Sequence, residues 1–182
     1  LVLGVTFGLM KVSESKLAAG LANVYIAVFR DTQLLVWAFF FYFGVPQLIG
    51  HSVNIWVAGA LTLSLNSGAY LAEIVRGAVQ SVDSGQMEGA RSLGLNHRQA
   101  MRRVILPQAS KIAMPSIINQ LVIMIKDSSL LLAIGFGELL YQAQQLYAAN
   151  FRVTETLLLV GVMSFVAIPI LTGLPNTVDR KG

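Results

Sequence analysis

Cysteine is absent from this chain of 182 residues, and charged side chains are scarce. Without a thiol, the chain forms no disulfide, holds no thiolate-ligated metal and has no cysteine nucleophile. Only 12% of its residues are Asp, Glu, Lys or Arg, about half of the ~25% found in a typical soluble domain. The hydrophobic share is 55% and the mean hydropathy is +0.66. This composition indicates a membrane protein.

Several signatures of other protein classes are also missing. No Gly-x-x-x-x-Gly-Lys-Ser/Thr phosphate loop occurs, so the chain is not expected to hydrolyse ATP. No carboxylate pair or catalytic triad stands together, so an enzyme is not expected. His51 and His97 are far apart, which argues against a metal site. Basic residues lie at the ends of apolar segments without interleaved aromatics, which fits membrane topology better than nucleic-acid binding.

Apolar segments predict an all-α, polytopic transmembrane bundle of about five spans. Residues 1–10 are uncharged but cover only about half a bilayer at a rise of 1.5 Å per residue, so they are expected to be the end of a truncated first span. Residues 32–72 contain no Lys, Arg, Asp or Glu and are long enough for two spans, with a turn at Pro46 and the following glycine cluster. The remaining spans are expected at these positions: 30–45, 54–76, from 111 past 119, and 156–178.

Two stretches outside these spans have their own patterns. Leu17, Leu21, Val24 and Val28 form a stripe at helical spacing, which predicts an interfacial helix over residues 13–30. We expect this helix to break near residues 30–32, before the second span. Residues 135–153 are more polar, with three glutamines, and are expected to form a loop.

Basic residues gather on alternate loops, and this asymmetry predicts orientation. One side would hold Lys11, Lys16, Arg91, Arg98, Arg102, Arg103, Lys111, Arg180 and Lys181. The other side would hold only Arg152. The positive-inside rule therefore places the 77–111 loop and the C-terminus in the cytoplasm.

The 77–111 loop itself has a readable local structure. Asp83 or Ser84 is expected to cap a helix over residues 86–92, with Glu88 near its positive end. Gly94 would end that helix as a C-cap. A second helix over residues 96–104 would follow, and Pro107 would disrupt the start of the fourth span. The simpler alternative is a plain connector with no partner.

Ionisable and polar side chains interrupt the predicted spans. Glu73 and Arg76 share a helix face at i,i+3 and can pair, either as an interfacial ion pair or as part of a transport path. Lys126 and Asp127 follow an uncharged run and either mark a pathway or anchor the span through a salt bridge. Polar groups in spans either join helices or line a cavity. The substrate-path candidates are Ser67, Tyr70, Glu73, Asn119, Lys126, Asp127 and Ser128.

The loop carries three short motifs at fixed spacing. These are Glu88-Gly89-Ala90, then after three residues Gly94, then after nine residues Val104-Ile105-Leu106-Pro107. The pattern resembles the "EAA" coupling loop of bacterial ABC importer permeases of the MetI-like type. Three further segments resemble the polar amino-acid branch of that family: 67–77, 85–88 and 126–130. Relatives commonly carry Arg-Gly-Thr-Pro-Leu-Leu where this chain has Arg-Asp-Thr-Gln-Leu-Leu at 30–35, so the glycine and proline of the hinge are missing.

The resemblance implies a single transmembrane permease domain over residues 1–182, with its coupling loop at about 82–107, in the bacterial cytoplasmic membrane. Its partners would be a cytoplasmic ABC ATPase dimer, a second permease chain and an extracytoplasmic solute-binding protein. ATP and Mg²⁺ would bind on the ATPase, and no cofactor would bind this chain directly. The residues implied to contact the ATPase are Glu88, Gly89, Ala90, Gly94, Leu95, Leu106 and Pro107.

Two other functions remain open on the residues alone. An ion-coupled secondary transporter would show inverted repeats and interrupted helices, and no convincing internal repeat is present. A membrane scaffold without transport activity would not need Glu73, Lys126 and Asp127 in or near the bilayer. The resemblance favours an importer permease for a polar amino acid.

Overall fold

The structure is a computed structural model that describes residues 1–176, and within those residues all regular elements are helical. The fold class is therefore the one that the apolar segments predict. Two helices, Ile55–Gln80 and the continuous run His97–Ile134, have the length and apolar character that a membrane crossing requires. A third crossing results if Lys16–Arg30 and Leu34–Ile49 are counted as one broken span. Val2–Lys11 and Val153–Ala167 are apolar but shorter.

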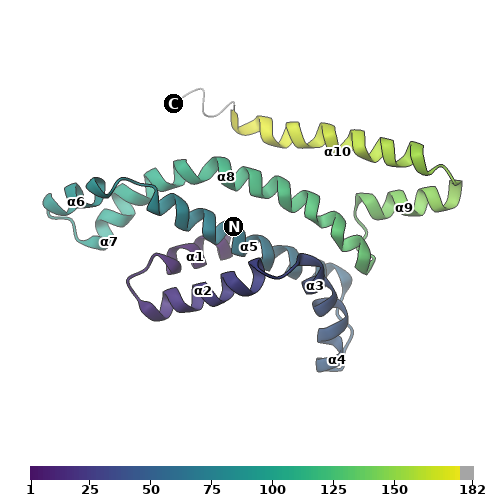
Figure 1. Ribbon diagram of the computed structural model, residues 1–182, viewed down its shortest axis with the longest axis horizontal. Helices are drawn as coiled ribbons and strands as arrows, with labels where there is room; N and C mark the ends of the chain where they lie inside the picture. Colours follow the sequence, from purple (N-terminus) through teal and green to yellow (C-terminus); the bar gives the residue numbers. More distant parts are fainter. Residues whose placement is uncertain (177–182) are drawn as a thin grey trace. The chain divides into compact units, whose positions relative to one another are not determined.

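The chain divides into two compact units, and the long helices α5 (Ile55–Gln80) and α8 (Leu106–Asp127) contribute to both. The first unit contains residues 1–32 and 64–120. In it, α1 (Val2–Lys11) and α2 (Lys16–Arg30) lie side by side (Figure 1). The short helices α6 (Ser84–Ser92) and α7 (His97–Ala100) lie between α5 and α8 in sequence.

Close backbone approach holds α1 on α5. A Cβ at Gly8 would lie 2.7 Å from Cβ of Val75, and Gly4 faces Leu71 in the same way. The two glycines are four residues apart, as are their partners, so α1 runs along α5 with one matched face. Only glycine leaves room for this packing.

Two side-chain hydrogen bonds tie α2 to α5. Tyr25 donates its hydroxyl to the Leu65 carbonyl at 2.8 Å, and Asn66 donates its amide to the Phe29 carbonyl at 2.8 Å. Asn66 is therefore a residue that joins helices, as the commoner use of polar groups in spans predicts. The predicted stripe on α2 faces outward, because Leu17 is 83% exposed while Ile26 on the other face is buried.

The second unit contains residues 33–63 and the chain from 121 onward. Its helices are α3 (Leu34–Phe39), the π-helix η1 (Phe40–Gly44), α4 (Val45–Ile49), the 3₁₀-helix η3 (Ser128–Ile134), α9 (Leu139–Asn150) and α10 (Val153–Asn176). Leu34, Ala38, Leu131 and Ile134 form its buried core. Phe136 extends this core and contacts Trp56, with ring centroids 4.6 Å apart.

The helix break between α2 and α3 is where the sequence predicts it. α2 ends at Arg30 and α3 begins at Leu34. Gln33, the N-cap of α3, is extended at φ −61° and ψ 137°. The break therefore forms with Asp31 and Gln33 at the positions where the resemblance implies a glycine and a proline.

The expectation that Pro46 and Pro107 interrupt their helices is wrong. Both helices continue through the proline, and a π-helix ends two residues before each one, at Gly44 and at Ile105. Proline has no N–H and its ring clashes with the carbonyl four residues earlier. In each π-turn the next amide instead reaches back five residues, from Val45 to Phe40 and from Leu106 to Met101. This wider turn absorbs the clash. The helix that contains Pro46 ends at Ile49 with Gly50, at φ 72°, as its C-cap, so the predicted turn lies at the glycine cluster and not at Pro46.

The predicted loop over residues 135–153 is also largely helical. After Gly135, with φ 80°, Glu138 caps α9 by accepting a hydrogen bond from the Tyr141 amide at 3.0 Å. The polar composition of this stretch led to the prediction of a loop, although Glu138 supplies the N-cap of a helix. The last span begins at Val153, and its predicted end at Val178, together with Arg180 and Lys181, lies outside the described residues.

Candidate coupling and transport sites

Helix α6 has defined ends in the predicted coupling loop. The Asp83 carboxylate accepts a hydrogen bond from the Gly85 amide at 2.8 Å, which confirms Asp83 as the cap. At the other end, Gly94 has φ 84°. Its amide donates to the Arg91 carbonyl at 2.9 Å, and the Leu95 amide donates to the Ala90 carbonyl at 3.3 Å. These two bonds form a Schellman motif, so the predicted role of Gly94 is confirmed.

The second helix of the loop begins with a capping box that the sequence reading missed. Asn96 accepts from the Gln99 amide at 2.9 Å, and Gln99 accepts from the Asn96 amide at 3.0 Å. The helix then runs through the π-helix η2 (Met101–Ile105) into α8 without interruption. The Asn-x-x-Gln spacing in the sequence is the signal that could have predicted this capping box.

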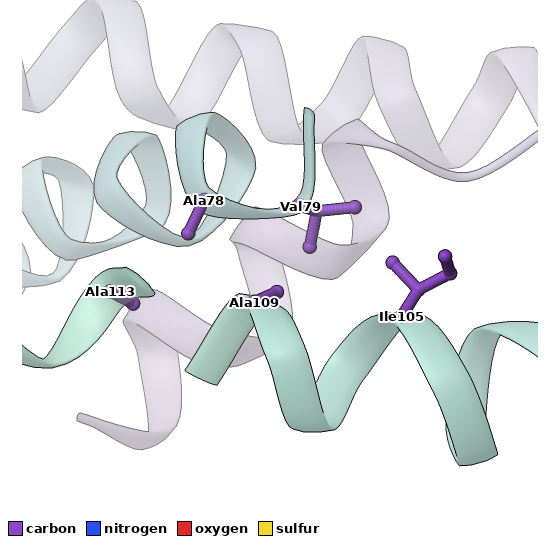
Figure 2. Close-up of a cluster of buried hydrophobic side chains, with 5 residues drawn as sticks. All are labelled: Ala78, Val79, Ile105, Ala109 and Ala113. Atoms are coloured by element: carbon purple, nitrogen blue, oxygen red, sulfur yellow. The ribbon is translucent and has the colours of Figure 1, made fainter. Parts of the chain in front are cut away.

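A small apolar cluster fixes the loop to the ends of the two long helices. Figure 2 shows Ala78 and Val79 of α5 facing Ile105, Ala109 and Ala113 of the helix that continues into α8. All five are buried. Met87 of α6 packs against this cluster, and Gln108 donates to Gln86 at 3.1 Å. α6 is therefore in contact with the ends of both α5 and α8.

The predicted ATPase-contact residues differ in accessibility. Glu88, Gly89, Gly94 and Pro107 are exposed, and Leu95 and Leu106 are half-buried. Ala90 is only 6% exposed and packs against its own chain. Gly89 is exposed and Ala90 is buried because helical geometry turns adjacent positions in different directions, so the implied contact of Ala90 with the ATPase stays a prediction.

Leu93 is a surface residue of the same helix that sequence reasoning missed. It is 86% exposed, directly before Gly94. A Cβ added at Gly89 would meet nothing within 4 Å. The accessible side of α6 thus combines an open glycine, an apolar side chain and the Glu88 carboxylate.

Glu73 is the centre of a charged cluster within α5. It accepts a hydrogen bond from Nε of Arg76 at 2.8 Å, which confirms the predicted pair. Lys11 of α1 donates to the same carboxylate, and the Arg30 guanidinium at the end of α2 lies 4.0 Å away. Lys11 and Arg30 are 62 and 43 residues from Glu73 in sequence, so only the packing of α1 and α2 on α5 brings them there.

The other substrate-path candidates fall into both units. In the first unit, Ser67 is buried, Asn119 is exposed, and the Tyr70 ring lies 6.0 Å from the Arg30 guanidinium carbon. Lys126, Asp127 and Ser128 belong to the second unit. Among the described residues of that unit, none forms an ion pair with Lys126 or Asp127. The predicted alternative of a structural salt bridge at this position therefore gains no support.

The described residues contain no group of three or more His, Asp or Glu side chains placed to hold a metal ion. What they contain is a capped surface helix attached to two long apolar helices, with a charged cluster inside one of them. The family model for the inner membrane component of binding-protein-dependent transport systems matches residues 1–181. The chain belongs to this family.

Similar proteins of known name agree with this assignment. The arginine transport system permease protein ArtQ of Bacillus subtilis (strain 168) is 37% identical over 181 residues, covering 100% of this chain and 83% of that protein. The glutamine transport system permease protein GlnP of Escherichia coli (strain K12) is 36% identical over 182 residues, covering 100% and 83%.

Solved structures give the same fold. The crystal structure of an amino acid ABC transporter with histidines matches with a TM-score of 0.92 at 37% identity, over 100% of this chain and 84% of that one. The inward-facing MetNI methionine ABC transporter matches with a TM-score of 0.73 at 20% identity, over 98% and 85%. The chain is thus a permease subunit of the ABC importer type, and neither a secondary transporter nor a scaffold.

Proposed function

We propose that this chain forms the membrane path for a polar amino acid and is driven by a separate cytoplasmic ATPase that docks on α6. The observation that carries the proposal is the exposed, capped helix α6. Its Met87 packs against the buried cluster of Ala78, Val79, Ile105, Ala109 and Ala113. Two of the relatives are named as arginine and glutamine transport permeases. Both substrates are polar amino acids, which is the class we propose here.

The docking surface would be Glu88, Gly89 and Leu93. Gly89 leaves space for close approach, Leu93 offers an apolar side chain, and Glu88 adds a charge at the rim. ATP and Mg²⁺ would bind on the ATPase. When the ATPase dimer closes on ATP, α6 would move with it, and the Met87 contact and the Gln86–Gln108 bond would carry the motion into α5 and α8.

The complete transporter would contain two permease chains, two ATPase subunits and an extracytoplasmic solute-binding protein, in the bacterial cytoplasmic membrane. If the second chain is identical, the path would lie on a two-fold axis. The 77–111 loop and the C-terminus would be cytoplasmic, as the basic residues of this loop favour.

Polar side chains within or near the apolar helices would line the path. The candidates are Ser67, Tyr70, Glu73, Asn119, Lys126, Asp127 and Ser128. Lys126 and Asp127, for which the described residues provide no ion-pair partner, support this role, because ionisable groups inside a span mark transport pathways by default.

Reconstitution of the complex in vesicles tests the proposal. ATP-dependent uptake would be measured with a panel of radiolabelled amino acids, including arginine, glutamine, leucine and methionine. We expect uptake of a polar amino acid that needs both ATP and the solute-binding protein. Preference for an apolar amino acid would overturn the substrate class, and uptake without ATP would overturn the coupling.

A further inference from the structure

The first unit has a basic groove whose residues are not among those proposed above for ATPase docking or for the transport path. Its volume is about 550 Å³, and it is lined by Asn96, Arg98, Gln99, Arg102 and Arg103. The three guanidinium groups are exposed. Within the described part of the chain, no carboxylate lies within ion-pair distance of any of them.

The lining of this groove offers hydrogen-bond donors. Guanidinium groups only donate. The side-chain oxygens of Asn96 and Gln99 already accept the amides of the capping box, which leaves their NH₂ groups for further bonds. Three positive charges within two helical turns repel one another. An anion with several oxygens removes this repulsion and uses the donors.

One acidic side chain, Glu14, lines the neighbouring groove and lies close to a histidine. Arg98 and Arg102 also line a neighbouring groove of about 930 Å³ that includes Glu14. The Glu14 carboxylate lies 3.7 Å from Nδ1 of His97. Glu14 is 82% exposed, so water screens its charge and it does not neutralise the arginines.

Apolar surface begins directly beyond the groove. After Arg103 the same continuous helix carries one charge, Lys111, before Lys126. Ile112 and Met114 are 46% and 53% exposed on α8. A ligand with an anionic head and hydrocarbon tails matches both surfaces, whereas a free phosphate or an acidic protein segment matches only the first.

We propose that this groove binds the phosphate headgroup of an anionic phospholipid, whose acyl chains lie along the exposed apolar side of α8. Basic pockets at the cytoplasmic ends of spans attract such headgroups, at about 1 kcal/mol per Arg or Lys. The inference rests on the proposed function only in assigning the groove to the cytoplasmic leaflet. The bound lipid holds the helix that follows the coupling helix at a fixed depth in the membrane.

The test is lipid binding by the purified chain in detergent, measured by native mass spectrometry without ATPase or substrate. Phosphatidylglycerol is the anionic probe, and phosphatidylethanolamine is the zwitterionic one. The variant is R102Q/R103Q, and the matched control is R91Q, an exposed arginine of the same loop outside the groove. R102K/R103K keeps the charge, and circular dichroism checks that each variant is folded.

We expect R102Q/R103Q to bind phosphatidylglycerol roughly 10- to 30-fold more weakly than wild type, since two charges near the surface are lost. R91Q should bind normally, and R102K/R103K should recover most of the binding. Equal binding by R102Q/R103Q and wild type would overturn the proposal, as would equal binding of phosphatidylethanolamine.

Two further results would assign the groove to another ligand. Displacement of phosphatidylglycerol by millimolar inorganic phosphate would indicate a site for free anions. Loss of ATPase co-purification in R102Q/R103Q with unchanged lipid binding would make the groove a protein contact. If vesicles with the wild-type complex fail to transport while lipid binding follows the expected pattern, the proposed transport function is refuted and the proposed lipid site is supported.

Discussion

Replacement of Gly94 by valine separates coupling from folding. Gly94 has φ 84°, a region in which a β-branched residue is a genuine outlier. The cost is about 1–2 kcal/mol. A Cβ at this position would meet no atom within 4 Å, so no clash adds to it. The strain therefore acts on the two hydrogen bonds of the Schellman motif, from Gly94 to Arg91 and from Leu95 to Ala90.

The rest of the first unit should not change. Gly94 is not part of the buried cluster that joins α5 to α8, which consists of Ala78, Val79, Ile105, Ala109 and Ala113. The variant should therefore insert and purify in normal amount. The end of α6 should shift or fray, which moves Leu93 and weakens ATPase binding by roughly 5- to 30-fold, the factor that corresponds to 1–2 kcal/mol. Co-purification of the ATPase and ATP-dependent uptake in vesicles measure this effect.

Gly94→Asn is the matched control, because asparagine tolerates the left-handed region. It should keep most of the uptake. Normal uptake and normal ATPase association by Gly94→Val would refute the reasoning that the cap positions the docking surface. Equal loss in Gly94→Asn and Gly94→Val would show that bulk, and not backbone conformation, is what the site rejects.

Four other predictions test the remaining features. Glu73→Gln should lower the unfolding free energy by roughly 1–3 kcal/mol, because Lys11 and Arg76 lose the charged acceptor to which both donate; thermal melts measure this, and an unchanged melting temperature would contradict it. Leu93→Asp should keep the melting temperature, since the side chain is 86% exposed, yet reduce ATPase co-purification; retained co-purification would remove Leu93 from the docking surface. Asp127→Asn should lower substrate-stimulated ATP turnover at normal expression, whereas loss of folded protein alone would favour a structural role. A cysteine at Arg98 should resist impermeant maleimide in intact cells and react after lysis, and labelling in intact cells would reverse the proposed orientation.

Local signals in the sequence were sufficient for the two ends of α6 in the coupling loop. Asp83 as a cap and Gly94 as a helix end depend on hydrogen bonds between neighbours in sequence, so their positions follow from residue type and spacing. The pairing of Glu73 with Arg76 is predictable for the same reason, because one turn of helix separates them. The apolar segments likewise predicted the all-helical fold, since a bilayer admits few alternatives to helices.

Where local rules allow more than one outcome, the prediction from the sequence was wrong. A proline does not always end a long helix: here Pro46 and Pro107 each follow a π-turn, and Pro115 lies within α8. Residue type alone does not decide between these outcomes, because π-turns occur mostly as single turns inside a longer α-helix and therefore depend on the helix around them.

The sequence by itself determined the helical class, the capped coupling loop and the family, because these depend on composition and on motifs at fixed spacing. Only the tertiary structure decided that Lys11 and Arg30 reach Glu73, that Ala90 faces inward while Leu93 faces outward, and that α6 is fixed to both long helices. Such contacts join residues far apart in sequence, or depend on which side of a helix is covered. Neither is set until α1, α2, α5 and α8 pack together.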